Sequence, residues 1–492
     1  MEDFIAILPE LFLAFTVGGL IFSEIGYYGE RYRLVTATAV LGLLGAAIQT
    51  ILATAGFGPQ IKSAFSGVIW IDPLTTFFRL FFIVLTGLAT IHVTRSKEVP
   101  AERKTELLAF LVASTAAYSL IAASNDLVLT WVAFQLSNAL IYFLGSFGVR
   151  NVSSTEASFK FLGFSMLASV LFALGVLVLF AATEQTQLSL IRETLQKNPL
   201  DKLSAWASFA LLSSGLCFQF AAFPSFTWAP DVLQGVPTPI SSFAATATRV
   251  GGFSAAIRIW ITLFSNYNET SSAWTPWEAL PWPQILAWVA GLSLVFGSVL
   301  AVRQNSARRL LGSLVVSQTG FVLLGLLVLD TQALGATLFS LLVELFALSG
   351  CYFVIARFVD ETSTDQIDEW KGMLRKYTGE SAALILFLGC FVGIPPLGGF
   401  FGRFSLVGAA VDHHWGALAA VALFSWALSW IAISRLCFAL VGDFSTARVA
   451  ENGVATRRLW SIFVSFGLPL LVLSIFTHPI LVWVTDSLRQ LK

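Results

Sequence analysis

The chain has 492 residues, of which 56% are hydrophobic and 12% charged, and 29 Lys and Arg side chains balance 29 Asp and Glu side chains. A net charge of zero gives no sign of nucleic-acid binding, and no stretch is long and polar enough to form a separate soluble domain. Apolar runs of about 20 residues recur from one end to the other, which is the pattern of an all-α polytopic membrane protein.

We expect about 14 transmembrane helices from these runs. Their approximate ranges are 5–24, 35–56, 74–94, 107–123, 126–147, 156–182, 203–228, 238–263, 283–302, 308–329, 332–358, 380–411, 415–442 and 459–485. The segment 185–199 is too polar to cross a membrane and is expected to lie at the interface. Most Lys and Arg residues outside the spans follow odd-numbered spans, for example Arg95, Arg303 and Lys371. These connections are therefore expected to face the inside, and both termini the outside.

Prolines interrupt two of these spans. Pro224 breaks the seventh, and Pro395 with Pro396 breaks the twelfth. Lipid cannot satisfy freed backbone groups, and interrupted helices at corresponding positions of inverted repeats mark ion paths in transporters. Because five spans separate the breaks, we expect two five-helix repeats of opposite orientation. The predicted division is 1–106 for the first three spans, 107–263 for the first repeat, 264–442 for the second repeat and 443–492 for the last span.

Several ionisable side chains lie inside the expected spans, where each charge costs a few kcal/mol. Lys160 follows Glu156 by four residues on one helix face, so it is either a snorkelling lysine paired with Glu156 or a site in a proton relay. Arg249 lies too deep to snorkel easily, which favours a buried network or a functional role. Arg403 follows the second break. Glu344 is central in its span without a cation within one turn, so it either carries a proton or has a partner on another helix.

Neutral polar side chains also lie deep in the spans. They are Gln135, Gln219 and Gln318. Each can hydrogen-bond water but cannot change charge, which limits its part in proton transfer. The charged residues nearer span ends are expected to be interfacial anchors, namely Asp72, Arg79, Arg258 and Arg435. The four cysteines lie singly in apolar runs without metal-ligand spacing, so they are expected to pack as small hydrophobic residues, and no metal or cofactor site is predicted.

Three segments carry a resemblance to a known family: PSFTWAPDVLQGVPTPISSF, RRLLGSLVVSQTGFVLLG and GIPPLGGFFGRF. Together they resemble the antiporter-like membrane subunits of respiratory complex I, and more narrowly its N subunit, called subunit 2 in mitochondria. Trp-Ala-Pro-Asp followed by Gly-x-Pro-Thr-Pro is the most specific part, since the M, L and sodium/proton antiporter relatives usually depart from it. The similarity covers most of the chain. It implies half-channels joined by a central row of lysines and a glutamate in a hydrated axis, where charge changes couple quinone reduction to proton translocation.

The chain departs from the family along that row. The resemblance places the family's glutamate at Gln135, its lysines at Gln219, Arg249 and Arg403, and its usual histidines at Gln318 and Phe226, while Lys160 keeps its usual identity. Glutamine does not titrate, and arginine keeps its proton at any accessible pH. The substitutions favour the hypothesis that the subunit keeps its fold and its place in the complex while its own proton channel is lost or rerouted.

The resemblance implies a non-redox membrane subunit of a proton-translocating NADH:quinone oxidoreductase, with no cofactor and no catalytic centre of its own. Its partners would be the M-, L-, K- and J-type subunits and lipids, without nucleic acid. The membrane would be a mitochondrial inner or bacterial cytoplasmic one, with both termini on the outer, proton-receiving side. Two roles are open within this function: an active proton channel, or a structural spacer that is electrically silent because it carries no protons. The alternative is a subunit of a cation/proton antiporter or of a membrane-bound hydrogenase.

Overall fold

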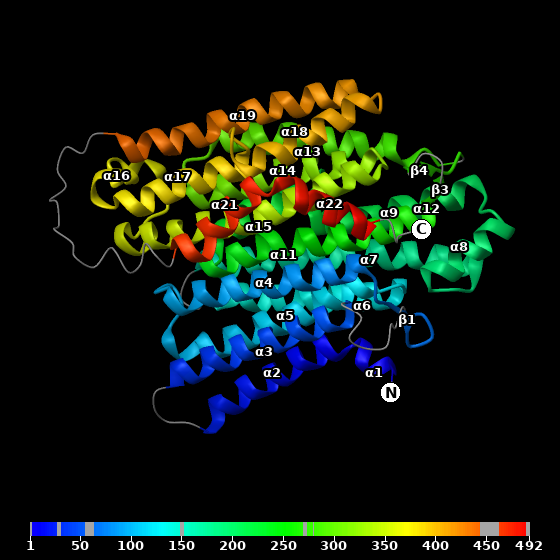
Figure 1. Ribbon diagram of the computed structural model, residues 1–492, viewed down its shortest axis with the longest axis horizontal. Helices are drawn as coiled ribbons and strands as arrows, with labels where there is room; N and C mark the ends of the chain where they lie inside the picture. The colour runs from blue at the N-terminus through cyan, green and yellow to red at the C-terminus, as the bar shows by residue number, and fades with distance from the viewer. Residues whose placement is uncertain are drawn as a thin grey trace.

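The computed structural model describes residues 2–26, 31–54, 63–147, 152–268, 273–278, 280–442 and 462–488. Within these residues, 10 helical segments are long and apolar enough to cross a membrane. They run roughly side by side along the long axis of the molecule (Figure 1). The ten segments belong to α3 (Arg31–Thr54), α4 (Pro73–Arg95), α5 (Lys104–Ala123), α6 (Leu127–Ser146), α7 (Val152–Thr183), α9 with α10 (Lys202–Phe220 and Trp228–Gly235), α13 (Trp282–Arg303), α14 (Ala307–Leu327), α15 (Thr331–Thr362) and α19 (Gly416–Val441). The expected all-α polytopic class is confirmed.

The four remaining expected spans coincide with shorter or less apolar helices, so the count of fourteen stays a prediction. The helices concerned are α2 (Leu8–Gly26), α11 (Thr238–Ala256), α17 (Thr378–Val392) with α18 (Gly398–Asp412), and α21 (Leu468–Ile475) with α22 (Thr477–Leu488). Residues 443–461, where the last predicted domain begins, lie outside the described residues.

Short elements complete the described chain. The helices are α1 (Glu2–Ala6), α8 (Leu188–Lys197), α12 (Thr262–Phe264) and α16 (Met373–Lys376), with 3-10 turns at Ala101–Arg103, Ser225–Thr227 and Ile367–Trp370 and π turns at Ile257–Ile261 and Phe463–Gly467. Two antiparallel hairpins pair β1 (Ser63–Ala64) with β2 (Ile69–Trp70), and β3 (Ser265–Asn268) with β4 (Ala273–Pro276). Helix α8 occupies the segment predicted as interfacial, and its ten residues are too few to span a membrane.

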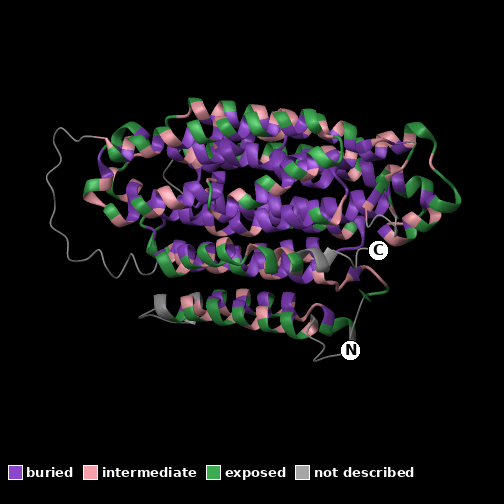
Figure 2. Cartoon of the chain, turned by 45° about the horizontal axis from the view of Figure 1, so that its top comes forward, coloured by how far each residue is buried: buried purple, intermediate pink, exposed green. Residues whose placement is uncertain are grey.

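Buried residues gather in the middle of the molecule, and exposed residues lie along its outer helices (Figure 2). Helices α14 and α15 are the most buried of the long apolar helices, whereas α2, α3 and α7 carry exposed apolar side chains such as Phe15, Leu41 and Leu167. Small residues let the core helices approach closely. A Cβ added to Gly297 of α13 would lie 2.2 Å from the backbone nitrogen of Ser317 in α14. This contact leaves no room for any larger residue. Close approach of this kind gives membrane helices van der Waals packing energy, since lipid provides no hydrophobic driving force between them.

Protein groups satisfy the backbone at both helix breaks. At the first, α9 ends at Phe220, Ala221 takes a left-handed conformation (φ 54°), and the Trp228 indole donates to the carbonyl of Phe218 at 3.1 Å. At the second, α17 ends at Val392, and the Trp426 indole donates to its carbonyl at 2.7 Å. Each break is therefore capped by an indole N–H, while its prolines, Pro224 at the first break and Pro395 with Pro396 at the second, are exposed on the surface of the subunit.

Two arginines expected as interfacial anchors are instead buried in ion pairs, so that expectation is wrong for them. Arg79 of α4 is 1% exposed and binds Glu10 of α2 through Nε at 2.8 Å and Nη2 at 3.0 Å. Arg258, also 1% exposed, binds Asp72 through Nη2 at 2.9 Å and donates from Nε to the carbonyl of Ala122 at 2.7 Å. Both pairs join helices distant in sequence, which spacing along a single span does not reveal.

Candidate functional site

A buried ion pair lies at the centre of the molecule, between α11 and α15. Arg249 donates from Nη2 to Oε1 of Glu344, and the two side chains are 1% and 2% exposed. Charges at this depth persist only when they are paired and hydrogen-bonded, so each side chain accounts for the other. The partner that the sequence left open for Glu344 is therefore Arg249, 95 residues earlier in the chain.

The central pair is only partly satisfied. Nε and Nη1 of Arg249 and Oε2 of Glu344 are buried without a hydrogen-bond partner. Gln219, in the last turn of α9, also has a buried atom without a partner, its Oε1. Its backbone is close to α11, because a Cβ added to Gly252 would lie 2.7 Å from the Cβ of Gln219. Because buried polar groups are nearly always hydrogen-bonded, these atoms indicate positions for internal water.

Arg403 forms a second buried cationic centre just after the second break. It donates to Oε1 of Gln318 and, at 3.0 Å, to the carbonyl of Phe391, and its guanidinium lies 4.6 Å from the centre of the Phe321 ring. Among the described residues, no carboxylate forms an ion pair with it, and its Nη1 has no hydrogen-bond partner. Neutral oxygens and a ring face thus hold a permanent positive charge.

Gln135 lies on α6 and is half-buried. Within the described part of the chain, no side-chain hydrogen bond joins it to Gln219, whose Oε1 is buried without a partner. The two positions that the resemblance assigns to a titrating pair are therefore neutral, and they are also unconnected by a direct hydrogen bond.

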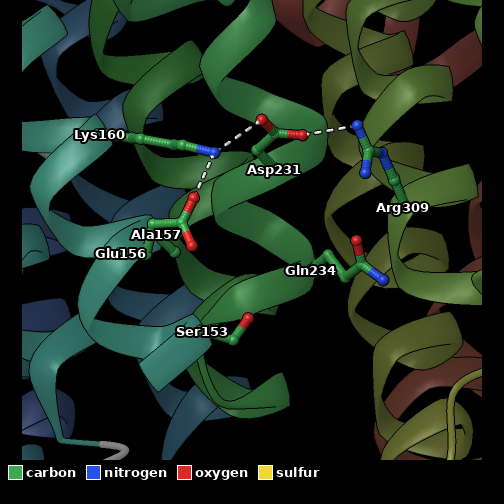
Figure 3. A pocket seen from close by; sticks show the side chains of 7 residues that line it. All are labelled: Ser153, Glu156, Ala157, Lys160, Asp231, Gln234 and Arg309. Carbon is green, nitrogen blue, oxygen red and sulfur yellow. Dashed lines mark hydrogen bonds and ion pairs between the residues drawn. The ribbon is translucent and has the colours of Figure 1, made fainter. Parts of the chain in front are cut away.

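Lys160 lies in a different place, in an exposed chain of charges. Its ammonium is 2.9 Å from Glu156, as the spacing predicts, and 3.3 Å from Asp231 of α10, whose other oxygen binds Arg309 of α14 at 2.7 Å. Lys160 and Arg309 reach Asp231 from opposite sides (Figure 3). Together with Ser153, Ala157 and Gln234, these residues line an open pocket of about 170 Å³.

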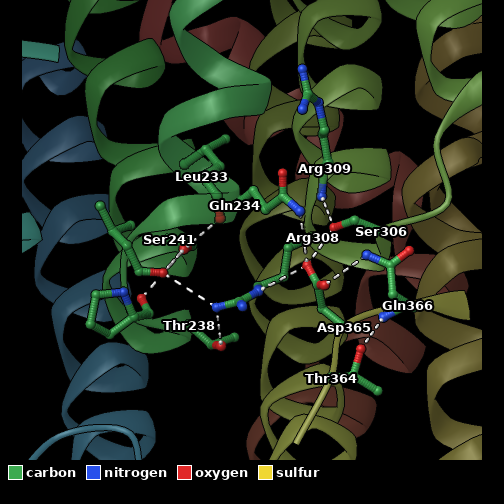
Figure 4. Close-up of polar contacts among 12 residues, drawn as sticks. Leu233, Gln234, Thr238, Ser241, Ser306, Arg308, Arg309, Thr364, Asp365 and Gln366 are labelled. Carbon is green, nitrogen blue, oxygen red and sulfur yellow. Dashed lines mark hydrogen bonds and ion pairs between the residues drawn. The ribbon is translucent and has the colours of Figure 1, made fainter. Parts of the chain in front are cut away.

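A neighbouring cluster holds the ends of several helices together, and sequence reasoning missed it. Arg308 extends from α14 between Thr238 and Asp365 (Figure 4). Its Nε lies 3.4 Å from Asp365, and its Nη1 lies 3.8 Å from Glu98. Glu98 in turn accepts from the backbone N–H of Thr238 at 2.7 Å, at the start of α11. The adjacent pair Arg308-Arg309 was the one visible signal, but its partners come from loops far away in sequence.

The described residues contain no group of three or more His, Cys, Asp or Glu side chains arranged to hold a metal ion. What the central groups offer chemically is one carboxylate, Glu344, set among arginines and glutamines. That arrangement can hold or release a proton at Glu344 and attract water.

Comparison with known proteins decides the family. A family model described as NADH:quinone oxidoreductase/Mrp antiporter, TM, matches residues 124–429, which is more than half of the chain and includes both breaks. The chain belongs to this family of antiporter-like membrane subunits. Within the family it is a distant relative of the N subunits. It is 28% identical to NADH-quinone oxidoreductase subunit N 1 of Solibacter usitatus, over 100% of this chain and 98% of that protein.

Solved structures share the family fold. A chain of respiratory complex I from Thermus thermophilus with bound aureothin is similar with a TM-score of 0.78 and 24% identity, covering 96% of this chain and 98% of that one. A chain of an archaeal membrane-bound sulfane sulfur reductase is similar with a TM-score of 0.84 and 19% identity, covering 99% and 97%. The family fold therefore serves more than one respiratory membrane complex, and the predicted resemblance to complex I antiporter-like subunits is confirmed.

Proposed function

We propose that this antiporter-like subunit works as the N-type membrane subunit of a proton-translocating NADH:quinone oxidoreductase, and that Glu344, paired with Arg249, is its proton-carrying group. The observation that carries the proposal is the buried Arg249–Glu344 ion pair, which joins α11 to α15. The relatedness to N subunits over the whole chain supports the choice of complex.

The finer architecture belongs to this proposal. We infer fourteen spans, with inverted repeats at 107–263 and 264–442 flanked by 1–106 and 443–492, because both breaks have the same form. The subunit would lie in an energy-coupling membrane with both termini outside, beside M-, L-, K- and J-type subunits and lipids. It would need no cofactor of its own.

The chemistry of the residues at the positions of the family's central row explains why Glu344 is the proposed proton carrier. Gln135, Gln219 and Gln318 have no titratable proton, and guanidinium groups keep theirs. Glu344 accepts a proton only when its contact with Arg249 opens, because the adjacent positive charge favours the carboxylate. Opening and closing this one contact would therefore couple a conformational change to the loading and release of one proton, in place of the family's Glu–Lys pair.

Protons moved per electron, measured on the complex purified through a tag on this subunit and placed in liposomes, test the proposal. Glu344→Gln should lower this ratio by one channel's share, since the amide keeps the shape but cannot carry a proton. Gln135→Leu and Gln219→Leu should leave it at the wild-type value. The double variant Arg249→Gln/Glu344→Gln removes both charges and should match Glu344→Gln if the loss comes from proton carrying.

Two results would change the proposal. A wild-type ratio in Glu344→Gln would make the subunit a silent spacer, which the three glutamines already favour. Absence of NADH-oxidising subunits from the purified complex would move the assignment to another respiratory complex, a hydrogenase or a cation/proton antiporter, an alternative supported by the TM-score of 0.84 with a chain of the sulfane sulfur reductase.

A further inference from the structure

His92 is a buried titratable group outside the central row. It lies on α4, three residues before that helix ends at Arg95, and is 2% exposed. Its ring centre is 5.0 Å from that of Phe353 on α15, and it lies beside the backbone of Tyr352. Its Nε2 is buried and has no hydrogen-bond partner. Filling space at this position does not require a buried polar nitrogen, so the histidine needs another explanation.

Helix α15 carries matching orphaned atoms between His92 and the central pair. The hydroxyls of Ser349 and Tyr352 and Oε2 of Glu344 are all buried without a partner. Glu344 and Tyr352 are eight residues apart on one helix, about 12 Å along its axis. Buried polar groups are rarely left unpaired, and ordered water is the usual partner when protein offers none. These three atoms on α15, together with Nε2 of His92 on α4, therefore indicate positions for internal water between His92 and Glu344.

Charged groups lie at the His92 end of these positions, near the expected inner face. Arg95 lies over the Phe353 ring at 5.9 Å, and Lys104 of α5 donates to the carbonyls of Ser96 at 2.9 Å and Thr94 at 3.2 Å. Asp360, half-buried in the last turns of α15, interacts with Lys104. Asp360 also interacts with Lys97, Glu98, Arg357 and Glu361, so charges of both signs gather at this end of α4, α5 and α15.

We propose that His92 is a proton relay between the inner aqueous face and Glu344, through waters held by Tyr352 and Ser349. Nε2 takes a proton from the inner side and returns it to the waters that lead along α15, where Glu344 accepts it as its contact with Arg249 opens. No electron moves, and each proton taken up at His92 is released at Glu344. This route bypasses Gln135 and Gln219, and it rests on the proposed function of Glu344.

The test compares protons moved per electron in the liposome-embedded complex for His92→Gln, Glu344→Gln and the double variant. Glutamine keeps hydrogen-bonding capacity but holds no exchangeable charge. We expect His92→Gln to lose the same share of the ratio as Glu344→Gln, and the double variant to lose no more. Electron transfer and the yield of the complex should be unchanged in His92→Gln. His413→Gln, at an exposed histidine after α18, serves as the matched control and should keep the wild-type ratio.

Each of the other outcomes overturns either the relay through His92 alone or the relay together with the proton-carrying role of Glu344. A wild-type ratio in His92→Gln with a lowered one in Glu344→Gln would overturn the relay and leave the proposed function standing, whereas wild-type ratios in both would overturn the two together. If His92→Gln assembles poorly, Tyr352→Phe removes one orphaned hydroxyl with little change in packing and should slow proton movement without changing the yield. Independently, a map that resolves water should show density between Nε2 of His92 and Oε2 of Glu344, and a dry gap there would contradict the relay.

Discussion

Two groups of charges in this molecule use the same residue types in opposite settings. The central pair, Arg249–Glu344, is almost entirely buried, joins two helices and leaves several polar atoms without partners. The second group, which runs from Glu156 through Lys160 to Asp231, is open to water, with side-chain exposures of 63%, 43% and 31%. Bulk water can screen and replace each contact in this exposed group, whereas the buried contact of the central pair is out of reach of bulk water.

The comparison distinguishes ion pairs that only add to the stability of the fold from an ion pair that has a function. Exposed ion pairs contribute little to stability, and a protein can lose them without consequence. A buried pair with missing partners is costly to maintain, so its presence needs a reason beyond stability. Ranking these groups by the effect of breaking them is therefore a direct test of where the function lies.

The largest effect should follow from removing the carboxylate of the central pair. Glu344→Met leaves the Arg249 guanidinium buried, unpaired and unable to lose its proton, at a cost of about 3–5 kcal/mol. Arg249→Met should cost less, because the remaining carboxyl group can become neutral by taking up a proton. The double variant should recover most of the loss. Unfolding of each variant in mixed micelles at rising SDS fraction measures this order, and equal losses for both single variants would contradict it.

An intermediate effect is expected at the buried pair of Asp72 and Arg258. Burial raises the pKa of the Asp72 carboxyl, but the charge and hydrogen bonds of Arg258 outweigh burial, so that this pKa lies below its ordinary value. The pair therefore stabilises the fold above the unfolded pKa of about 3.9, and this contribution is lost as the pH falls through the folded value. Asp72→Asn should cost about 2 kcal/mol at pH 7.

The pH dependence sharpens this prediction. Between pH 5 and pH 3 the wild-type protein should lose stability that Asp72→Asn has already lost, so the two unfolding curves should converge as the solution is acidified. A difference that stays constant over this range would contradict a role for the charge, since asparagine can still accept from the backbone N–H of Thr75, as Asp72 does at 2.7 Å.

The smallest effect is expected at Lys160. Because its ammonium is exposed and shared between Glu156 and Asp231, Lys160→Gln should leave the unfolding transition within experimental error of wild type. It should also leave the ratio of protons to electrons unchanged, since the side chain is not part of the central groups. A lowered ratio with unchanged stability would return Lys160 to the proton path.

Local patterns allowed much of this molecule to be predicted from sequence. Hydrophobic runs predict its long apolar helices, prolines predict where α9 and α17 end, and the four-residue spacing predicts the contact of Lys160 with Glu156. All of these depend on residues within one helix. Gln318 was visible for the same reason, because it lies inside a quoted motif, whereas Gln135 and Gln219 were placed by the resemblance alone.

What could not be predicted depends on contacts between helices. The partner of Glu344 lies 95 residues away, that of Arg79 lies 69 residues away, and Arg308 meets Glu98 and Asp365 from separate loops. Helical periodicity places a charge on a face but does not say which helix covers that face. The interfacial role expected for Arg79 and Arg258 failed for this reason.

The distance in sequence between Arg249 and Glu344 also matters for how the protein is made. As the eighth predicted span, α11 would carry Arg249 into the membrane. It is not among the ten segments found long and apolar enough to cross, and an arginine at the centre of a span costs about 2.5–3.5 kcal/mol on insertion scales. Synthesis at about 5–20 residues per second delivers Glu344 roughly 5–20 s later. Until α15 is synthesised, the first half of the chain would lie in the bilayer with an unpaired positive charge. The Arg249–Glu344 contact would then join the two halves of the chain.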